Sequence, residues 1–191
     1  MVKVKKRCGW CTADSEYIAY HDQEWAVPIR DRQALYKLLM LEGMQAGLSW
    51  LTILRKRPAM EKAFFDFDVN RLANSGARHV NAWLRNPDII RHRGKLEALI
   101  SNAQAMQALD DFVDFIWQFE PRKRRHYQSL ADVPAATDES SQMSKALKQM
   151  GFKFVGPTIC YAFMQSAGLV NDHVKECWRF EICEDLQTRA R

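Results

Sequence analysis

Apolar residues recur every three to four positions along almost the whole of this 191-residue chain. That spacing is typical of amphipathic helices, whereas a half-buried strand requires an alternation of apolar and polar residues that the sequence does not sustain. We therefore predict an all-α fold without a sheet. Because 47% of the residues are hydrophobic and 27% are charged, the chain can fill one globular core or two small lobes that share an interface.

Two helices are predicted in the first third of the chain. Asp31 is a suitable N-cap for the first, whose apolar stripe contains Leu35, Leu38, Leu39 and Leu41. The second spans 48–57 and is expected to end at Pro58, because proline lacks the N–H that a helix interior requires. Shorter helices are predicted over 59–65, 69–74, 77–86, 94–109 and 112–119. The segment 129–140 lacks periodicity and is predicted to be a surface connection.

The formal net charge of +5 at pH 7 favours a polyanion, such as nucleic acid, as the partner. Basic residues gather at 3–7, 55–57, 91–95 and 122–125. Each cluster alone is more often a solvated face than a binding surface, so only their convergence in space is informative. The basic start is followed by no apolar stretch, and no apolar run is long enough to span a bilayer. We therefore predict a cytoplasmic protein with no membrane partner.

The chain contains five cysteines, which is an odd number. In an intracellular protein this favours reduced thiols or metal ligands over a disulfide framework. Cys160 lies among apolar residues of a predicted helix, and we interpret it and Cys183 as structural.

Thiol and imidazole groups lie near both ends of the chain. Cys8, Cys11 and His21 are near the N-terminus, while His173 and Cys177 have the i, i+4 spacing that shares one helix face. Four such ligands suit a structural zinc ion, which binds thiolate and imidazole in a closed tetrahedron and would clasp the two ends together. Spacing alone leaves one choice open, because Cys8 and Cys11 form a C-x-x-C half-site that competes with Cys8 and His21.

The segment 151–173 reads GFKFVGPTICYAFMQSAGLVNDH, in which two glycines precede a proline-started helix. Gly151 and Gly156 permit positive φ and a close approach of the main chain to a ligand. Pro157 at the first helical position leaves neighbouring N–H groups free for an anion such as a DNA phosphate. The alternative is that this turn only joins two helices, which is the usual role of such a segment.

Several other segments accompany this hairpin in a fixed order: RCGW, YIAYHDQEW, LEGMQAGLSW, IIRHRGK and SKALKQMGFKFVGPTICYAFMQSAGLVNDHV. With them the chain resembles the DNA-3-methyladenine glycosylase I family over residues 7–177. The resemblance implies an all-α helix-hairpin-helix glycosylase fold. In such a fold residues 1–191 would form a single domain of two helical lobes that share the active-site cleft. It also implies excision of 3-methyladenine from alkylated DNA, a step of base excision repair, and a zinc clasp that joins the N- and C-terminal segments.

The resemblance further assigns one zinc ion and a base pocket to particular residues. By position the zinc ligands are Cys8, His21, His173 and Cys177, which leaves Cys11 outside the set. The base pocket, also by position, consists of Trp10, Tyr20, Glu42 and Trp50. The sequence departs from the common family pattern at Ala26 and Met44, where glycine and glutamine are familiar, but neither change removes a pocket group.

A glycosylase has to rotate its target nucleotide out of the base stack, because the glycosidic bond is otherwise shielded. Aromatic walls can then stack on the base, and the Glu42 carboxylate can accept hydrogen bonds from its exocyclic amine. We predict Glu42 to be the catalytic and substrate-binding group, because N3-methylation makes adenine cationic and opposite charges attract strongly in a desolvated pocket. Without the resemblance, Trp50 would more often be a core residue and Glu42 a solvated one.

Many relatives of this fold carry an aspartate just before the histidine of a V-D-x-H segment, where it supports the electron-poor sugar. Here the same place reads Val170, Asn171, Asp172, His173. No lysine in 156–172 is available as an amine nucleophile. We therefore predict a monofunctional, water-using enzyme whose leaving group is already positively charged, with Asp172 as a possible helper displaced by one residue.

Contacts with double-stranded DNA are predicted in two places. The hairpin would contribute Gly151, Phe152, Lys153, Phe154 and Gly156, with Lys153 as the side-chain phosphate contact. The loop at Gly47 and Leu48 would occupy the gap left by the flipped base. The expected partners are DNA containing alkylated bases and the released 3-methyladenine, and the protein is expected to act as a monomer.

Two other functions compete with this hypothesis. A non-catalytic, zinc-braced helix-hairpin-helix DNA-binding module would share the hairpin and the clasp, but it would not need the aromatic and acidic residues around Glu42. An acid-metal hydrolase is disfavoured, because a zinc ion with four protein ligands has no open position for water.

Overall fold

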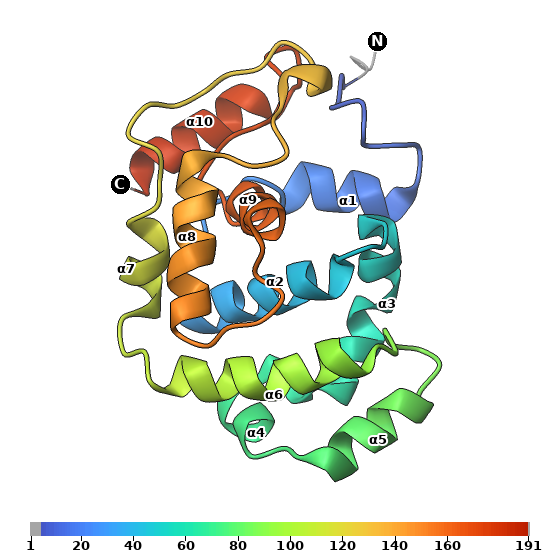
Figure 1. Cartoon of the computed structure of the whole chain (residues 1–191). Helices are drawn as coiled ribbons and strands as arrows, with labels where there is room; N and C mark the ends of the chain where they lie inside the picture. Colours follow the sequence, from blue (N-terminus) through green and yellow to red (C-terminus); the bar gives the residue numbers. More distant parts are fainter. Residues whose placement is uncertain (1–4, 191) are drawn as a thin grey trace.

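The computed structural model describes residues 5–190, and within that range it contains helices, turns and loops but no β-strand (Figure 1). The prediction of an all-α fold is therefore confirmed. The α-helices are α1 (Ser15–Gln23), α2 (Arg32–Gln45), α3 (Trp50–Ala63), α4 (Val69–Ala73), α5 (Ala77–Arg85), α6 (Arg93–Gln107), α7 (Phe112–Trp117), α8 (Asp138–Gln149), α9 (Pro157–Ser166) and α10 (Phe180–Arg189). Short 3-10 turns cover Phe65–Phe67 and Leu130–Asp132.

Aspartate caps set several of the helix starts, as the sequence predicted for α2. The Asp31 carboxylate accepts a hydrogen bond from the Ala34 N–H at 2.7 Å, and Asp68 accepts one from Arg71 N–H at the same distance. Each bond satisfies an N–H that has no partner inside the helix.

The prediction that a helix ends at Pro58 is wrong. α3 runs through Pro58 to Ala63 and absorbs most of the separate helix that we expected over 59–65. A proline in a helix interior costs about 3 kcal/mol. The continued helix buries Met60 and Phe64 completely in the core, and such side chains contribute about 1.5–3 kcal/mol each, which offsets that cost.

The long helix α2 passes through the middle of the molecule (Figure 1). It packs against α9 on one side and against α3 and α6 on the other, while α8 covers α9 and α4 covers α6. One continuous hydrophobic core joins these helices. α2 therefore lies inside this core, in contact with α3, α6 and α9.

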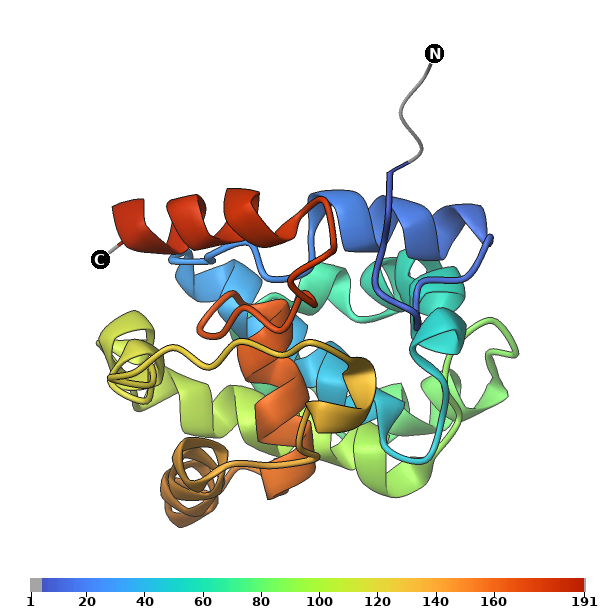
Figure 2. The same cartoon turned by 90° about the horizontal axis from the view of Figure 1, so that it is seen from above.

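A second, smaller core forms where the ends of the chain meet. Figure 2 shows α1 and α10 on the same side of the molecule, next to one another. Cys8, Tyr20, Trp25, Val174 and Cys177 are buried together between them. The close approach of the chain near this core depends on glycine at one point. Gly168 has φ +75°, and a Cβ there would lie 2.5 Å from the backbone nitrogen of Pro28.

None of the helices in residues 5–190 is both long and apolar enough to cross a membrane.

Candidate functional site

Two thiols and two imidazoles meet in the small core between the chain ends. The possible ligand atoms of Cys8, His21, His173 and Cys177 all lie within 4.8 Å of one another, and all four residues are buried. We call these four residues the Cys2His2 cluster. The Cys177 sulfur lies 3.4 Å from both His21 Nε2 and His173 Nδ1, and the Cys8 sulfur lies 3.5 Å from His173 Nδ1. The predicted joining of the N- and C-terminal segments is confirmed.

The outer nitrogens of both imidazoles have acceptors that fix their orientation. His21 Nδ1 lies 2.8 Å from the Asp22 carboxylate, and His173 Nε2 lies 3.4 Å from the Trp25 carbonyl oxygen. Asp22 in turn accepts hydrogen bonds from Arg7 and from the Trp178 indole, which hold its pKa well below the usual range despite partial burial. Metal-bound histidines nearly always have such a partner on the second nitrogen, because it fixes the tautomer and aims the first nitrogen at the ion.

The donor set fits one metal ion. The interaction with Cys177, together with burial, raises the pKa of Cys8, whereas hydrogen bonds from Cys8, His173 and His21 lower the pKa of Cys177 despite its burial. Cys11 lies outside the cluster, half-buried, with its sulfur 3.6 Å from the Tyr17 carbonyl oxygen. The geometry therefore agrees with the ligand set that the resemblance implied, and the C-x-x-C alternative is not formed.

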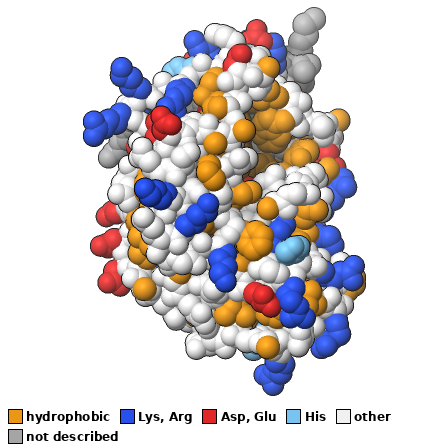
Figure 3. Space-filling model, in the orientation of Figure 1, with side chains coloured by type: hydrophobic (Ala, Val, Ile, Leu, Met, Phe, Trp, Pro, Cys, Tyr) orange, Lys and Arg blue, Asp and Glu red, His pale blue; other side chains and the backbone are white. Residues whose placement is uncertain are grey.

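Next to this cluster lies a cavity of about 410 Å³, lined by residues of α1, α2, α3, α9 and adjoining loops. That volume lies within the ~300–1,000 Å³ typical of small-molecule sites. Figure 3 shows a hollow with apolar walls in the upper part of one face of the molecule. All four residues predicted for the base pocket line the cavity: Trp10, Tyr20, Glu42 and Trp50.

Glu42, near the C-terminal end of α2, is the buried acid of the cavity, with a side chain that is only 1% exposed. Its Oε1 atom accepts a hydrogen bond from the Ser166 hydroxyl at 2.7 Å, and Ser166 accepts one from the Tyr20 hydroxyl at 2.8 Å. Oε2 is buried and has no hydrogen-bond partner among residues 5–190. Burial raises the pKa of Glu42 to about 8, against the opposing effect of the Ser166 hydrogen bond.

Aromatic rings form the walls around this acid. Tyr20 and Trp50 have ring centroids 5.3 Å apart, and Trp10 and Trp25 form a T-shaped pair with ring centroids 5.0 Å apart. The indole N–H of Trp50 is buried and, like Glu42 Oε2, has no hydrogen-bond partner in the part of the chain that the structure describes. The cavity thus combines flat apolar faces with polar groups that include a donor and an acceptor without protein partners, which is the kind of lining that can hold a flat heterocycle.

Sequence reasoning missed several residues of this cavity. Tyr17 and Gln165 line it beside Ser166. The predicted helix after Pro157 contained Ser166 and Gln165, but the sequence did not show which face of that helix would point toward Glu42. Tyr17 lies three positions before Tyr20, and that spacing on a helix was the available signal.

Asp172, which we expected only as a possible helper, lies in the wall of the cavity. It is buried and accepts hydrogen bonds of 2.7 Å from the Tyr161 hydroxyl and from the Gln165 amide. Its neighbour Asn171 instead donates to the Phe180 carbonyl and to Glu184 of α10. Of these two residues it is therefore Asp172 that supplies a carboxyl group to the cavity.

The predicted DNA-contact hairpin connects α8 to α9. Gly151 has φ +92° and Lys153 is exposed, as the prediction required. Gly156, however, has φ −65°, so our argument that it uses glycine's left-handed conformation is wrong; the positive φ falls on Phe154 instead, at 56°. Phe152 is buried against Phe112, with ring centroids 6.4 Å apart, so its side chain belongs to the core.

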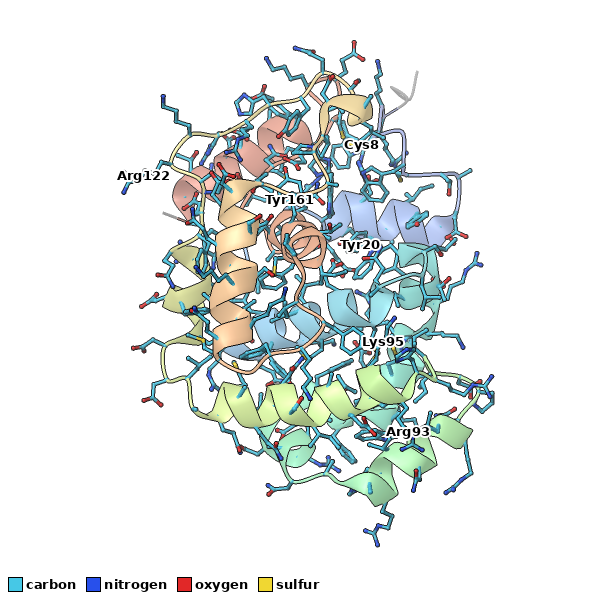
Figure 4. All side chains as sticks on the ribbon, in the orientation of Figure 1. Cys8, Tyr20, Arg93, Lys95, Arg122 and Tyr161 are labelled. Atoms are coloured by element: carbon cyan, nitrogen blue, oxygen red, sulfur yellow. The ribbon has the colours of Figure 1, made fainter. Side chains whose placement is uncertain are left out.

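The second predicted DNA-contact segment is the loop between α2 and α3. Gly47 has φ +79°, and Leu48 is exposed to 41%, which is unusual for a leucine of this molecule. The ammonium group of Lys95, at the start of α6, donates hydrogen bonds of 2.8 Å to the Met44 carbonyl and 2.6 Å to the Ala46 carbonyl (Figure 4). Lys95 therefore holds the last turn of α2, from which this loop begins.

The same helix α6 also holds the hairpin. The Asn102 side chain accepts a hydrogen bond from the Lys153 N–H at 2.8 Å and donates one to the Lys153 carbonyl at 3.1 Å. α6 thus fixes both predicted DNA-contact segments through buried polar side chains.

Comparison with known proteins agrees with this geometry. The sequence profile of the methyladenine glycosylase family matches residues 10–180. The chain is 47% identical over 178 residues to DNA-3-methyladenine glycosylase 1 of Escherichia coli, covering 90% of this chain and 95% of that protein. A crystal structure of a 3-methyladenine DNA glycosylase I matches with a TM-score of 0.88 and 47% identity over 91% of this chain and 98% of that one. A variant of a 3-methyladenine DNA glycosylase I in complex with 3-methyladenine matches with a TM-score of 0.85 and 40% identity over 91% and 97%. The chain belongs to the methyladenine glycosylase family.

Proposed function

We propose that this protein is a monofunctional DNA glycosylase that excises 3-methyladenine from alkylated double-stranded DNA by hydrolysis, the first step of base excision repair. The observation that carries the proposal is Glu42, a buried acid with one unpartnered oxygen inside an aromatic cavity. A flipped purine can stack on Trp50, Tyr20 and Trp10 while its exocyclic amine donates to Glu42 Oε2.

The charge of Glu42 explains why an alkylated base is preferred. In the free protein the carboxyl group has a pKa of about 8, so much of it is protonated at neutral pH. A cationic base in the cavity favours the ionised form, because opposite charges attract strongly where water is excluded. Unmodified adenine is neutral and brings no such attraction. The cavity therefore selects the cation by charge as well as by shape.

The reaction needs little further activation. Water attacks the anomeric carbon of the sugar, the glycosidic bond breaks, and its electron pair moves onto the departing base. The base thereby loses its positive charge, and the attacking water releases a proton. Asp172 is the second carboxyl group of the cavity, and we propose that it supports the electron-poor sugar in the transition state. Full retention of the excision rate in Asp172→Asn would exclude that role.

We propose that the hairpin grips the DNA backbone and that Leu48 fills the space of the flipped base. Exposure of Lys153 and Leu48 supports this arrangement, since an exposed leucine in a loop is suited to insert between base pairs. Both lobes would then act as one domain, with the cavity between them, in a protein that functions as a monomer.

We propose zinc as the ion of the Cys2His2 cluster. Two thiolates and two imidazoles are the ligand types that structural zinc sites use, and four protein ligands leave no open position for chemistry. Zinc would supply folding free energy here and tie residue 8 to residue 177.

Release of free base from methylated DNA, measured by chromatography, tests the proposal. The wild-type protein should release 3-methyladenine, whereas Glu42→Gln should reduce release by about 10²-fold with little change in DNA affinity. Glu181→Gln, which changes an exposed glutamate of α10, is the matched control and should release base normally. Binding without release by the wild-type protein would instead identify a non-catalytic DNA-binding module.

A further inference from the structure

A single buried hydroxyl links two of the residues assigned to base recognition. Ser166, at the C-terminal end of α9, lies between Tyr20 of α1 and Glu42 of α2, and only 5% of it is exposed. The Tyr20 hydroxyl donates to Ser166 Oγ at 2.8 Å, and Ser166 donates to Glu42 Oε1 at 2.7 Å. Figure 4 shows Tyr20 beside α9, where this chain of hydrogen bonds forms.

The direction of this chain is fixed by how many hydrogens it holds. A serine hydroxyl has one hydrogen and can accept from others. Since Tyr20 donates to Ser166, the single hydrogen of Ser166 remains for the carboxylate. A hydrogen bond to an ionised acceptor is stronger than one between neutral groups, so this arrangement favours the ionised form of Glu42.

The same bond decides which oxygen of Glu42 is available. Oε1 is occupied by Ser166, whereas Oε2 is buried and has no protein partner. A carboxylate held at one oxygen cannot rotate freely, so the free oxygen has a defined place in the cavity. Preorganised acceptors of this kind discriminate better than mobile ones, because no reorientation is required on binding.

We propose that Ser166 is a positioning residue for Glu42, which holds Oε1, stabilises the carboxylate, and thereby leaves Oε2 as the atom that reads the cationic base. The inference rests on the proposed function, because it assigns Ser166 a part in the recognition that Glu42 performs. It adds a specificity-determining residue to the cavity.

Other charged and titratable groups around Glu42 do not replace this effect. Tyr20 faces it from α1, Asp172 lines the same cavity from the segment after α9, and Tyr17 lies one turn before Tyr20. None of the described residues that line the cavity is a lysine or an arginine. Burial raises the pKa of Glu42, and the hydrogen bond from Ser166 lowers it.

The test is the pH dependence of kcat/KM for base release by Ser166→Ala, from pH 6 to pH 9.5. Because kcat/KM reports ionisations of the free enzyme, the wild-type profile should rise as Glu42 ionises around pH 8. In Ser166→Ala that rise should move to higher pH by about one unit. Excision at pH 7 should therefore fall about tenfold, and much of the loss should be recovered at pH 9.5.

Ser144→Ala is the matched control. Ser144 is also a buried serine, on α8, and it donates at 2.6 Å to the Val155 carbonyl rather than to the cavity. This variant should leave the pH profile in place even if it lowers stability. Ser166→Thr keeps the hydroxyl and should show the wild-type profile. If the alanine variant does not fold, Ser166→Cys takes its place. Its thiol is a weaker donor, so its profile should shift by an amount between those of the wild type and the alanine variant.

Glu42→Gln separates the failure of this inference from that of the proposed function. If Glu42→Gln releases base at the wild-type rate, recognition by the carboxylate is wrong and so is the role of Ser166. If Glu42→Gln is inactive while Ser166→Ala or Ser166→Cys keeps the wild-type rate and pH profile, only the role of Ser166 is wrong.

Discussion

The Cys2His2 cluster and the cavity lie next to one another, and both bury ionisable groups, yet they satisfy those groups differently. In the cluster, each imidazole has an acceptor on its outer nitrogen, and four donor atoms converge on one point. In the cavity, Glu42 Oε2 and Trp50 Nε1 are buried and have no protein partner. Burying a polar group without a partner is costly, so natural folds retain such atoms where a ligand supplies the partner. Arg124 Nε, Arg179 Nε and Gln187 Nε2 are also buried without a partner, but they lie outside the cavity. The two atoms of Glu42 and Trp50 differ in that their residues line a cavity with aromatic walls, which is the place for a ligand.

Tyr20 and His21 show how close the two regions are. These neighbours on α1 point to different sites, with His21 in the cluster and Tyr20 in the cavity wall. Adjacent residues of α1 therefore contribute to the cluster and to the wall of the cavity. If the comparison is right, loss of the cluster should disturb stability first, whereas loss of a cavity group should disturb chemistry.

The largest effect is expected from loss of the metal. Structural zinc contributes about 10 kcal/mol or more in small zinc-binding peptides, and here it would join residues that are distant in sequence. Cys177→Ala, or treatment with a strong chelator, should lower the free energy of unfolding by at least ~3–5 kcal/mol, measured by thermal or urea denaturation. Cys11→Ala removes a nearby thiol outside the cluster and should have little effect. Equal melting temperatures for the two variants would contradict a closed metal site.

The second effect concerns the pH dependence of stability. The pKa of Glu42 is raised in the folded protein from 4.5 to about 8, so the folded state binds more protons than the unfolded state between these values. Stability is therefore lost as the pH rises from 4.5 through 8. Glu42→Gln removes this dependence and should be more stable than the wild type at pH 8 by roughly 2–4 kcal/mol. The measurement is the urea midpoint of both proteins at pH 5 and pH 8.

The same variant should gain stability and lose base release. This is expected where a binding site keeps an unpartnered acid, because the acid lowers the stability of the fold while it serves the function. If the stability of both proteins changes with pH in the same way, the Glu42 carboxyl group is well solvated. That result would contradict the claim that the cavity holds a buried acid without a partner.

The third effect is expected at Lys95, a buried charged residue outside the cavity whose ammonium group, unlike Glu42 Oε2, has hydrogen-bond partners. Lys95→Met should leave the carbonyls of Met44 and Ala46 without donors and loosen the loop that carries Leu48. We expect release of base from DNA to fall roughly tenfold, at an energetic cost of about 1–2 kcal/mol. Binding of free 3-methyladenine, followed by tryptophan fluorescence, should hardly change, since no atom of Lys95 lines the cavity. An equal loss of both activities would indicate general damage to α2.

The sequence predicted the helices and the cluster better than it predicted the cavity. Helix starts at Asp31 and Asp68 follow from local capping. His173 and Cys177 do meet in the cluster, but the prediction that they share a helix face is wrong, because residues 167–179 form turns and loops between α9 and α10. The end of α3 could not be predicted in this way, because burial of Phe64 in the core decides whether the helix continues past Pro58.

The cavity depends even more on contacts between distant segments. Ser166 and Glu42 are separated by 124 positions, and nothing in the local sequence indicates their hydrogen bond. The pocket residues Glu42 and Trp50 were predicted from the resemblance to a family rather than from periodicity, which gave a core position for Trp50. Local sequence patterns therefore specify elements, while the open polar atoms of a site arise from packing between them.

The smallest effect is expected at Ala26, between the two regions. Ala26 is buried with φ 64°, a conformation that glycine adopts without strain, and it follows Trp25, whose carbonyl oxygen lies 3.4 Å from His173 Nε2. Ala26→Gly relieves a left-handed strain of ~1–2 kcal/mol but increases the entropy of the unfolded chain, so a net gain of about 0.5–1 kcal/mol is expected.

In a protein of this size that gain corresponds to a rise of about 1–4 °C in Tm, which differential scanning calorimetry can measure. Base release should stay at the wild-type rate, because Ala26 lies outside the wall of the cavity. Gly168→Ala is the opposite control and should be destabilising, since its Cβ would lie 2.5 Å from the Pro28 nitrogen. If Ala26→Gly instead lowers Tm, the restricted backbone of Ala26 helps to hold the Trp25 carbonyl oxygen in place for His173. The strained conformation would then stabilise the cluster.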